Sequence, residues 1–280
     1  MKLFSTLMLA ASLPFMMQAA EPTDTVTVFM IGDSTMANKP LAKENQERGW
    51  GQMLPVYLQG KIKVDNHAVN GRSSKSFIDE GRWDKVMSLI RPGDYVIIQF
   101  GHNDEKPKAD RHTDPGSTFD ANLRRFVNDA KSKGATPILM NAIARRNFPP
   151  TAGQDIASES DDKQKDWKGQ DPNEGVILVD THGAYLDSPR NVAAETGVTF
   201  VDMNKITSAL VQNLGTTNSR ELFMWIPANT YEFCPKGKID NTHLNVHGAL
   251  IVSRLAVNAL AKQMPELRRY IRPEVYNLND

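Results

Sequence analysis

The residues best placed for chemistry are a serine near the start of the chain and a histidine near its end. Ser34 lies in a Gly-Asp-Ser-Thr segment at 32–35, directly after the apolar run 26–31. The run predicts a buried strand, and the residues after it can begin a helix. Unpaired backbone N–H groups at a helix start favour developing negative charge. Ser34 is therefore a candidate nucleophile for a reaction that forms an oxyanion.

Acyl transfer by a serine also needs a base, a group that orients the base, and donors for the oxyanion. His243 is the candidate base, and Asp240, three residues earlier, is the candidate orienting group. The order serine, aspartate, histidine is compatible with a triad, because triads are defined by geometry and not by order. The candidate oxyanion donors are the backbone N–H groups of Ser34 and Gly71 and the side-chain amide of Asn103.

Each of these residues also has a purely structural interpretation. Asp33 belongs to a turn, and we expect it to brace that turn without taking part in chemistry. Asp240 could cap the helix that we expect to begin at 240–243. Gly71 follows an asparagine in a tight-turn pair, and Asn103 could brace a loop.

No metal or other cofactor is expected. His243 and His247 have the spacing of a helical zinc pair, but the sequence offers neither a His-Glu-x-x-His pattern nor a third ligand. The remaining histidines, at 67, 102, 112 and 182, are scattered and expected on the surface or in loops. Cys234, the single cysteine, has no base near it in sequence and can form no internal disulfide.

The elements that must position these side chains alternate along the chain. Short apolar runs predict strands at 26–31, 62–64, 95–100, 137–140 and 198–201, and the segments between them carry helical periodicity. This alternation indicates βαβ units, and therefore a parallel sheet with helices on both faces. Ligands of such sheets bind beyond the carboxyl ends of the strands. The segments 32–35, 70–72 and 101–104 all follow expected strands.

The remaining segments look less regular. Residues 147–172 are polar and predict a surface insertion, residues 215–242 predict irregular chain, and residues 265–280 predict a charged tail. No repeat or low-complexity linker divides the chain, so we expect one domain over 21–280.

Composition and the N-terminus restrict the class of protein. The chain has 280 residues, with 33 Lys plus Arg and 33 Asp plus Glu, so its net charge gives no sign of a nucleic-acid partner. Residues 1–20 resemble a signal peptide, with a lysine, an apolar stretch and small residues before Glu21. We therefore expect export to the periplasm or the exterior, and no membrane span in the mature protein.

Four short motifs together resemble the SGNH (GDSL-type) hydrolase superfamily. They are Gly32-Asp33-Ser34, Gly71, Gly101-x-Asn103-Asp104 and Asp240-x-x-His243, in that order. The resemblance implies a flavodoxin-like α/β fold, a three-layer α/β/α sandwich with a five-stranded parallel sheet. It also implies Ser34, Asp240 and His243 as the catalytic residues and Ser34, Gly71 and Asn103 as the oxyanion hole.

Within that superfamily the chain is most similar to rhamnogalacturonan acetylesterases. The supporting stretches are Gly32 to Ala37, Arg48-Gly49-Trp50-Gly51, Asn70 to Ser73, Gly101 to Asp104 and Asp240 to His243. The resemblance implies a monomeric, metal-independent esterase that removes acetyl groups from a pectic polysaccharide. The alternatives are a lipid esterase or thioesterase on the same fold and a non-catalytic carbohydrate-binding module.

Four further residues are candidates for binding an acidic polysaccharide. Arg72 and Arg145 could pair with uronate carboxylates. Trp83 and Trp225 could stack on sugar rings, although a tryptophan is more often part of the core.

Overall fold

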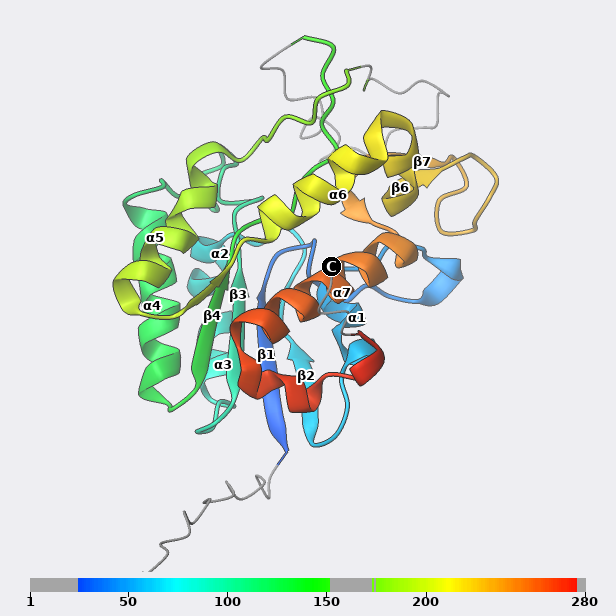
Figure 1. Cartoon of the computed structure of the whole chain (residues 1–280). Helices are drawn as coiled ribbons and strands as arrows, with labels where there is room; N and C mark the ends of the chain where they lie inside the picture. The colour runs from blue at the N-terminus through cyan, green and yellow to red at the C-terminus, as the bar shows by residue number, and fades with distance from the viewer. Residues whose placement is uncertain (1–24, 152–172, 174, 276–280) are drawn as a thin grey trace, which may run out of the picture.

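The computed structural model describes residues 25–151, 173 and 175–275. Five parallel strands form the central sheet in the order β2-β1-β3-β4-β5 (Figure 1). Their bounds are β1 Val26–Gly32, β2 Ile62–Asn66, β3 Tyr95–Gln99, β4 Thr136–Met140 and β5 Thr199–Val201. The predicted α/β fold with a five-stranded parallel sheet is confirmed, and the strand order is that of flavodoxin-like proteins.

Helices cover both faces of this sheet (Figure 1). The α-helices are α1 Trp50–Met53, α2 Ser74–Asp79, α3 Arg82–Met87, α4 Thr118–Ser132, α5 Asp187–Thr196, α6 Met203–Asn218 and α7 Val246–Gln263. The 3-10 segments are Ala42–Glu44, Leu54–Tyr57, Gly183–Leu186, Ser219–Leu222, Pro265–Tyr270 and Pro273–Val275. Helices α1, α6 and α7 pack on one face, and α2 to α5 pack on the other.

Two hydrophobic clusters fill the spaces between the layers. Successive strand residues point to opposite faces, so Met30 joins the cluster under α7 while Ile31 joins the cluster under α4. Both side chains are fully buried. The central strands are therefore apolar throughout, which explains why they were predictable from the sequence.

A second, two-stranded antiparallel sheet was not predicted. β6 Phe223–Ile226 pairs with β7 Lys238–Leu244, and Figure 1 shows the pair beside the end of α6. The expectation that 215–242 is irregular was therefore wrong in part, and it holds for residues 227–237. Asp240 and His243 lie on β7 and not at a helix start. The last helix begins at Val246, and its cap is Asn245, whose side chain accepts from Gly248 N.

Two other expectations about irregular segments were also wrong in part. The insertion expected from 147 starts inside the protein, since Asn147 and Phe148 are fully buried. Its later part, 152–172, lies outside the described residues, as does the expected signal peptide at 1–20. The expected charged tail packs on the core as far as Val275, because Leu267, Tyr270 and Ile271 are buried between its charged residues.

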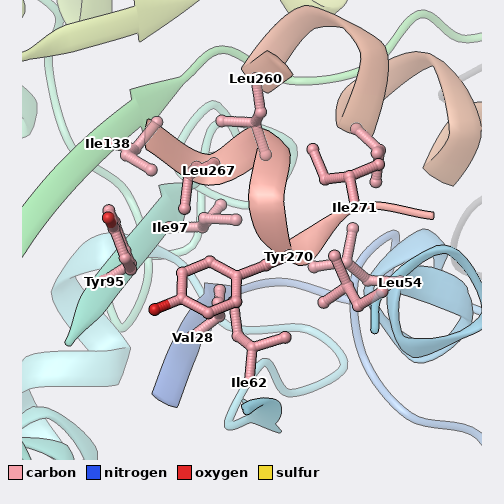
Figure 2. A pocket seen from close by; sticks show the side chains of 12 residues that line it. Val28, Leu54, Ile62, Tyr95, Ile97, Ile138, Leu260, Leu267, Tyr270 and Ile271 are labelled. Atoms are coloured by element: carbon pink, nitrogen blue, oxygen red, sulfur yellow. The ribbon is translucent and has the colours of Figure 1, made fainter. Parts of the chain in front are cut away.

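No helix in the described ranges is long and apolar enough to span a membrane. A small apolar cavity of about 20 Å³ lies near the starts of the strands, away from the strand ends that carry Ser34 (Figure 2). Val28, Ile62 and Tyr270 are among its lining residues. It is a packing defect with room for about one water molecule.

Replacing Tyr270 by Phe tests the packing around this cavity. The Tyr270 hydroxyl is buried and has no hydrogen-bond partner among the described residues. Removing it should leave the free energy of unfolding unchanged or raise it by about 1 kcal/mol. Tyr57→Phe is the matched control, because the Tyr57 hydroxyl donates to Leu250 O at 2.9 Å. The Tyr57→Phe variant should lose about 1 kcal/mol of its free energy of unfolding. Urea unfolding measures the free energy of unfolding of both variants. An equal loss in both would contradict the finding that the Tyr270 hydroxyl has no hydrogen-bond partner in the described part of the chain.

Candidate active site

Ser34 lies immediately beyond β1, in a turn that leaves no room for a side chain at Gly32. A Cβ there would lie 2.5 Å from Gln99 O on the neighbouring strand β3. Asp33 is fully buried, and its Oδ1 accepts from Thr35 N at 2.9 Å and from Thr35 Oγ1 at 2.8 Å. These contacts are those of a residue that braces the turn.

The structure brings Ser34, His243 and Asp240 together in one hydrogen-bonded line. His243 Nε2 lies 2.8 Å from Ser34 Oγ, and His243 Nδ1 lies 2.8 Å from Asp240 Oδ2. An ionised carboxylate only accepts, so Nδ1 carries the proton and Nε2 is left to accept the serine hydroxyl. Asp240 Oδ1 accepts from the backbone N–H of His243 at 2.8 Å, which fixes the carboxylate on β7.

Electrostatics make His243 a stronger base than an ordinary histidine. Burial alone would lower the pKa of His243, but the adjacent Asp240 carboxylate and its hydrogen bond raise the pKa above the usual value. Burial likewise acts to raise the pKa of Asp240, yet His243 and Lys238 hold that pKa well below its usual range. The Asp240 carboxylate is therefore ionised, and it stabilises a proton on the imidazole.

Three charged residues that the sequence did not single out form a network behind this pair. Lys238 Nζ lies 3.1 Å from Asp240 Oδ2 and 2.9 Å from Glu47 Oε2. Glu47 Oε1 lies 2.8 Å from Lys39 Nζ, whose side chain is buried. Burial acts to raise the pKa of Glu47, but His243 and the two lysines lower it to about 2. The network holds two cations and two anions, so the buried charges balance.

The predicted oxyanion donors lie around the same cavity as Ser34. Gly71 has a φ of 73°, a conformation that favours glycine. Arg111 Nη1 donates to Asn103 Oδ1 at 3.3 Å, which leaves the amide N–H groups of Asn103 for another acceptor. Ser34, Gly71 and Asn103 all line this cavity. Their arrangement can stabilise a negative oxygen.

The cavity has a volume of about 210 Å³ and polar walls. Its lining residues are Ser34, Glu47, Asn70, Gly71, His102, Asn103, Lys106, Arg111, Thr242 and His243. None of these lining residues has a purely hydrocarbon side chain. Lys106 and Arg111 supply positive charge. Both lie in the loop between β3 and α4, and the sequence analysis did not single them out.

A second hollow of about 430 Å³ lies near the bridge between Glu47 and Asn245. Gln46 and Asn245 line it. Gln46 is next in sequence to the cavity residue Glu47, and Asn245 lies close in sequence to the cavity residue His243. Trp225 and Tyr231 supply its aromatic walls. Trp225 Nε1 donates to Asn241 Oδ1 at 3.0 Å, which fixes the indole on β6.

The other predicted substrate-binding residues do not line either hollow. Trp83 is fully buried and donates to Asp129 Oδ2 at 2.8 Å, so the prediction that it contacts substrate was wrong. The Arg145 side chain is also fully buried and pairs with Glu105 at 2.6 Å, so it cannot meet a carboxylate from solvent. Arg72 pairs with Glu80 at the surface. The sequence analysis noted that a tryptophan is more often part of the core, and Trp83 is in the core.

The zinc alternative finds no geometric support. His243 lies on β7, whereas His247 lies on α7 and lines the second hollow. Among residues 25–151, 173 and 175–275, no three His, Cys, Asp or Glu side chains are grouped as metal ligands. Cys234 is buried beside Met224 and Ile226, consistent with a structural cysteine.

A second aspartate–histidine pair, which sequence analysis missed, lies against the same cavity. His182 Nδ1 lies 2.9 Å from Asp180 Oδ1, and His182 Nε2 lies 3.0 Å from His102 Nδ1. Both residues lie in loops, as one of the two expectations had it, but their imidazoles are buried and not at the surface. The only sequence signals were the Asp-x-His spacing at 180–182 and the position of His102 beside Asn103.

Comparisons with known proteins agree with this geometry. Residues 30–249 match the GDSL-like lipase/acylhydrolase family. The chain is 34% identical over 235 residues to the rhamnogalacturonan acetylesterase RhgT of Bacillus subtilis, covering 84% of this chain and 89% of that protein. It is 26% identical to a rhamnogalacturonan acetylesterase of Emericella nidulans, with 84% of each covered.

Solved structures show the same fold. The crystal structure of the Bacillus subtilis protein YxiM matches with a TM-score of 0.66 and 27% identity, covering 87% of this chain and 58% of that one. A lipase/acylhydrolase from Enterococcus faecalis matches with a TM-score of 0.52 at 15% identity, covering 89% of this chain and 98% of that one, which shows the fold alone.

Replacing Glu47 by Gln tests the electrostatic setting of His243. The Glu47 carboxylate raises the pKa of His243 by stabilising the imidazolium, so its loss should lower that pKa. Only neutral imidazole can take the proton of Ser34. The rate at which a phosphonate ester labels Ser34 rises with pH through the pKa of His243, and the rise should move to lower pH in Glu47→Gln.

Glu195→Gln is the matched control, since Glu195 pairs with Arg124 on the surface. It should label with the pH profile of the unaltered protein. A profile in Glu47→Gln that stays in place, or moves to higher pH, would contradict the role given to Glu47.

Proposed function

Because the chain belongs to the GDSL-like lipase/acylhydrolase family, we propose that it is an exported serine esterase that removes acetyl groups from a pectic polysaccharide such as rhamnogalacturonan. The observation that carries this proposal is the polar, positively charged cavity around a hydrogen-bonded Ser34. Two relatives are named rhamnogalacturonan acetylesterases, which supports the same substrate class.

In the first half of the reaction, Ser34 Oγ attacks the carbonyl carbon of the acetyl ester. His243 Nε2, 2.8 Å away, takes the serine proton as the new C–O bond forms. The Asp240 carboxylate stabilises the resulting imidazolium through Nδ1. The backbone N–H groups of Ser34 and Gly71 and the amide of Asn103 donate to the oxyanion.

The tetrahedral intermediate then breaks its bond to the sugar oxygen. His243 Nε2–H gives its proton to that oxygen, so the sugar leaves as an alcohol and acetyl remains on Ser34. A water molecule repeats the sequence: His243 takes its proton, the water oxygen attacks the acetyl carbon, and Ser34 regains a proton as acetate leaves.

The walls of the cavity favour a sugar ester over a lipid ester. Long acyl chains need apolar walls, and the residues that line this cavity have polar or charged side chains apart from glycine. Lys106 and Arg111 offer charge-assisted hydrogen bonds to a uronate carboxylate. We assign to them the role that the sequence analysis gave to Arg72 and Arg145.

The second hollow suits the continuation of a polysaccharide chain. Trp225 and Tyr231 offer aromatic side chains and Gln46 offers an amide, which are groups that sugars bind. Residues at or next to the Glu47–Asn245 bridge line both the hollow and the cavity. Trp225 therefore keeps a proposed role in binding substrate. Export rests on the signal-like residues 1–20 and on the extracellular nature of pectic polymers.

Ser34→Ala tests the proposed nucleophile. Acetate release from acetylated rhamnogalacturonan should fall on the order of 10⁴- to 10⁶-fold, because the covalent intermediate cannot form. Ser132→Ala is the control, since its hydroxyl bonds only within the surface of α4. Acetate release that survives in Ser34→Ala would remove Ser34 from the mechanism, and faster cleavage of long-chain acyl esters by the unaltered protein would favour a lipid esterase.

Lys106→Met tests recognition of the uronate. The substrates are an acetylated galacturonic acid and its methyl ester, in which one added methyl group removes the charge of the carboxyl group. Unaltered protein should prefer the free acid, and Lys106→Met should reduce that preference by roughly fivefold. Lys108→Met, an exposed lysine of the same loop, should keep the preference. Equal preferences in all three proteins would show that Lys106 does not meet the carboxylate.

A further inference from the structure

His102 is held beside the catalytic serine by a chain of buried hydrogen bonds. Asp180 Oδ2 accepts from the backbone N–H groups of His182 and Gly183 at 2.9 Å each, which fixes the carboxylate. Its Oδ1 lies 2.9 Å from His182 Nδ1, and His182 Nε2 lies 3.0 Å from His102 Nδ1. The chain therefore runs from a partly exposed carboxylate through one imidazole to the second.

The donors and acceptors along these hydrogen bonds, from Asp180 to His102, fix the tautomer of His102. Hydrogen bonds from His182 lower the pKa of Asp180 to about 2 even though burial acts to raise it, so Asp180 is ionised and accepts. His182 places its proton on Nδ1 to meet it, and its Nε2 is then an acceptor. His102 must donate from Nδ1, and its Nε2 is left with a free lone pair. The catalytic pair Asp240–His243 uses the same logic for Ser34.

One nitrogen of His102 is buried and has no partner among the described residues, and the residue lines the cavity that contains Ser34. His102 is 3% exposed, and its Nε2 has no hydrogen-bond partner among the described residues. The ring lines the cavity that contains Ser34 and Asn103. Nδ1 is engaged with His182, so Nε2 is the ring nitrogen left for a ligand.

His102 also stays neutral. Burial lowers the pKa of His102 well below the usual value, and the nearby charge of Arg145 lowers it further. A neutral imidazole with its proton on Nδ1 is an acceptor at Nε2, and a buried acceptor without a partner is unfavourable. A ligand that brings a donor to this position satisfies it.

We propose that His102 Nε2 accepts a hydrogen bond from a substrate hydroxyl next to the scissile acetyl ester. This inference rests on the proposed esterase function and deepens it. It assigns His102 as a specificity-determining residue and His182 and Asp180 as the positioning residues that select its tautomer. The preferred substrates are monoacetylated vicinal diols, the pattern of a partly acetylated sugar ring. An alkyl ester leaves the lone pair unpaired and is disfavoured.

Two esters measure the contribution of the neighbouring hydroxyl. One is methyl galactopyranosiduronate with a single acetyl group next to a free ring hydroxyl, and the other is the analogue in which hydrogen replaces that hydroxyl. The unaltered protein should cleave the first with a kcat/KM roughly tenfold higher or more. This ratio needs no variant, so it tests the proposal even if a substitution impairs folding.

Two substitutions at His102 form a matched pair. Gln reaches the position of Nε2 with an amide oxygen, whereas Asn reaches only the position of Nδ1. His102→Gln should retain part of the preference for the hydroxyl-bearing ester, and His102→Asn should reduce the ratio to about one. A His102→Asn variant that loses activity equally on both esters has a structural defect alone, and that result would overturn the proposal.

Asp180→Asn tests the positioning role. An asparagine can donate to His182 Nδ1, which selects the other tautomer in both rings and converts His102 Nε2 into a donor. Nitrogen NMR of labelled histidine should show His102 Nε2 unprotonated in the unaltered protein and protonated in Asp180→Asn, whose ester ratio should also fall. A protonated Nε2 in the unaltered protein would refute the assignment.

Failure of this inference is distinguishable from failure of the proposed function. If the protein is not a sugar acetylesterase, neither sugar ester is cleaved, although an activated ester such as p-nitrophenyl acetate still acylates Ser34. If only the role of His102 is wrong, the unaltered protein cleaves both sugar esters with equal kcat/KM.

Discussion

The buried negative charge of Asp240 is the interaction on which the rest of the site depends. The carboxylate is 3% exposed, and an isolated charge in that position would be unstable. His243 and Lys238 both lie within 3.1 Å of its Oδ2, and Lys238 is shared with Glu47. The requirement to balance one buried anion therefore brings together β7, the loop that carries Glu47 and the end of β1. The same requirement raises the pKa of His243 and gives Ser34 a base that stays close to it.

The two sheets carry different residues of the site. The five-stranded sheet presents Ser34, Gly71 and Asn103 from the carboxyl ends of neighbouring strands, where parallel order brings distant residues together. The small antiparallel sheet presents Asp240 and His243 from the side. A parallel sheet supplies several loop ends at one edge, but a base must approach the nucleophile from another direction. The Asp180–His182–His102 chain adds a third direction of approach, from the segment before α5.

The sequence was sufficient for the central fold and for naming the residues that the structure brings together around Ser34, and it failed where contacts are made between distant segments. β1 and β3 were predictable because both faces of each strand are buried, so their residues are apolar throughout. β7 was not, because the segment 238–244 is mostly polar and exists as a strand only through its pairing with β6. The partners of Lys39 and Lys238 depend on that pairing, and single charged residues carry no pattern that predicts an ion pair. His102 and His182 are 80 positions apart, and only tertiary structure joins them.

The position of His243 on the small sheet has a consequence for how activity reports on structure. The 2.8 Å contact between His243 and Ser34 is a distance between two separately hydrogen-bonded sheets. A shift of one sheet against the other breaks this contact while every strand remains paired. The rate of turnover therefore depends on how the two sheets are positioned against each other. It reports a change in that position more sensitively than spectroscopic measures of secondary structure do. Some positions along the surface where β6 and β7 meet α7 are far from the cavity. Substitutions there can abolish turnover while the fold remains intact.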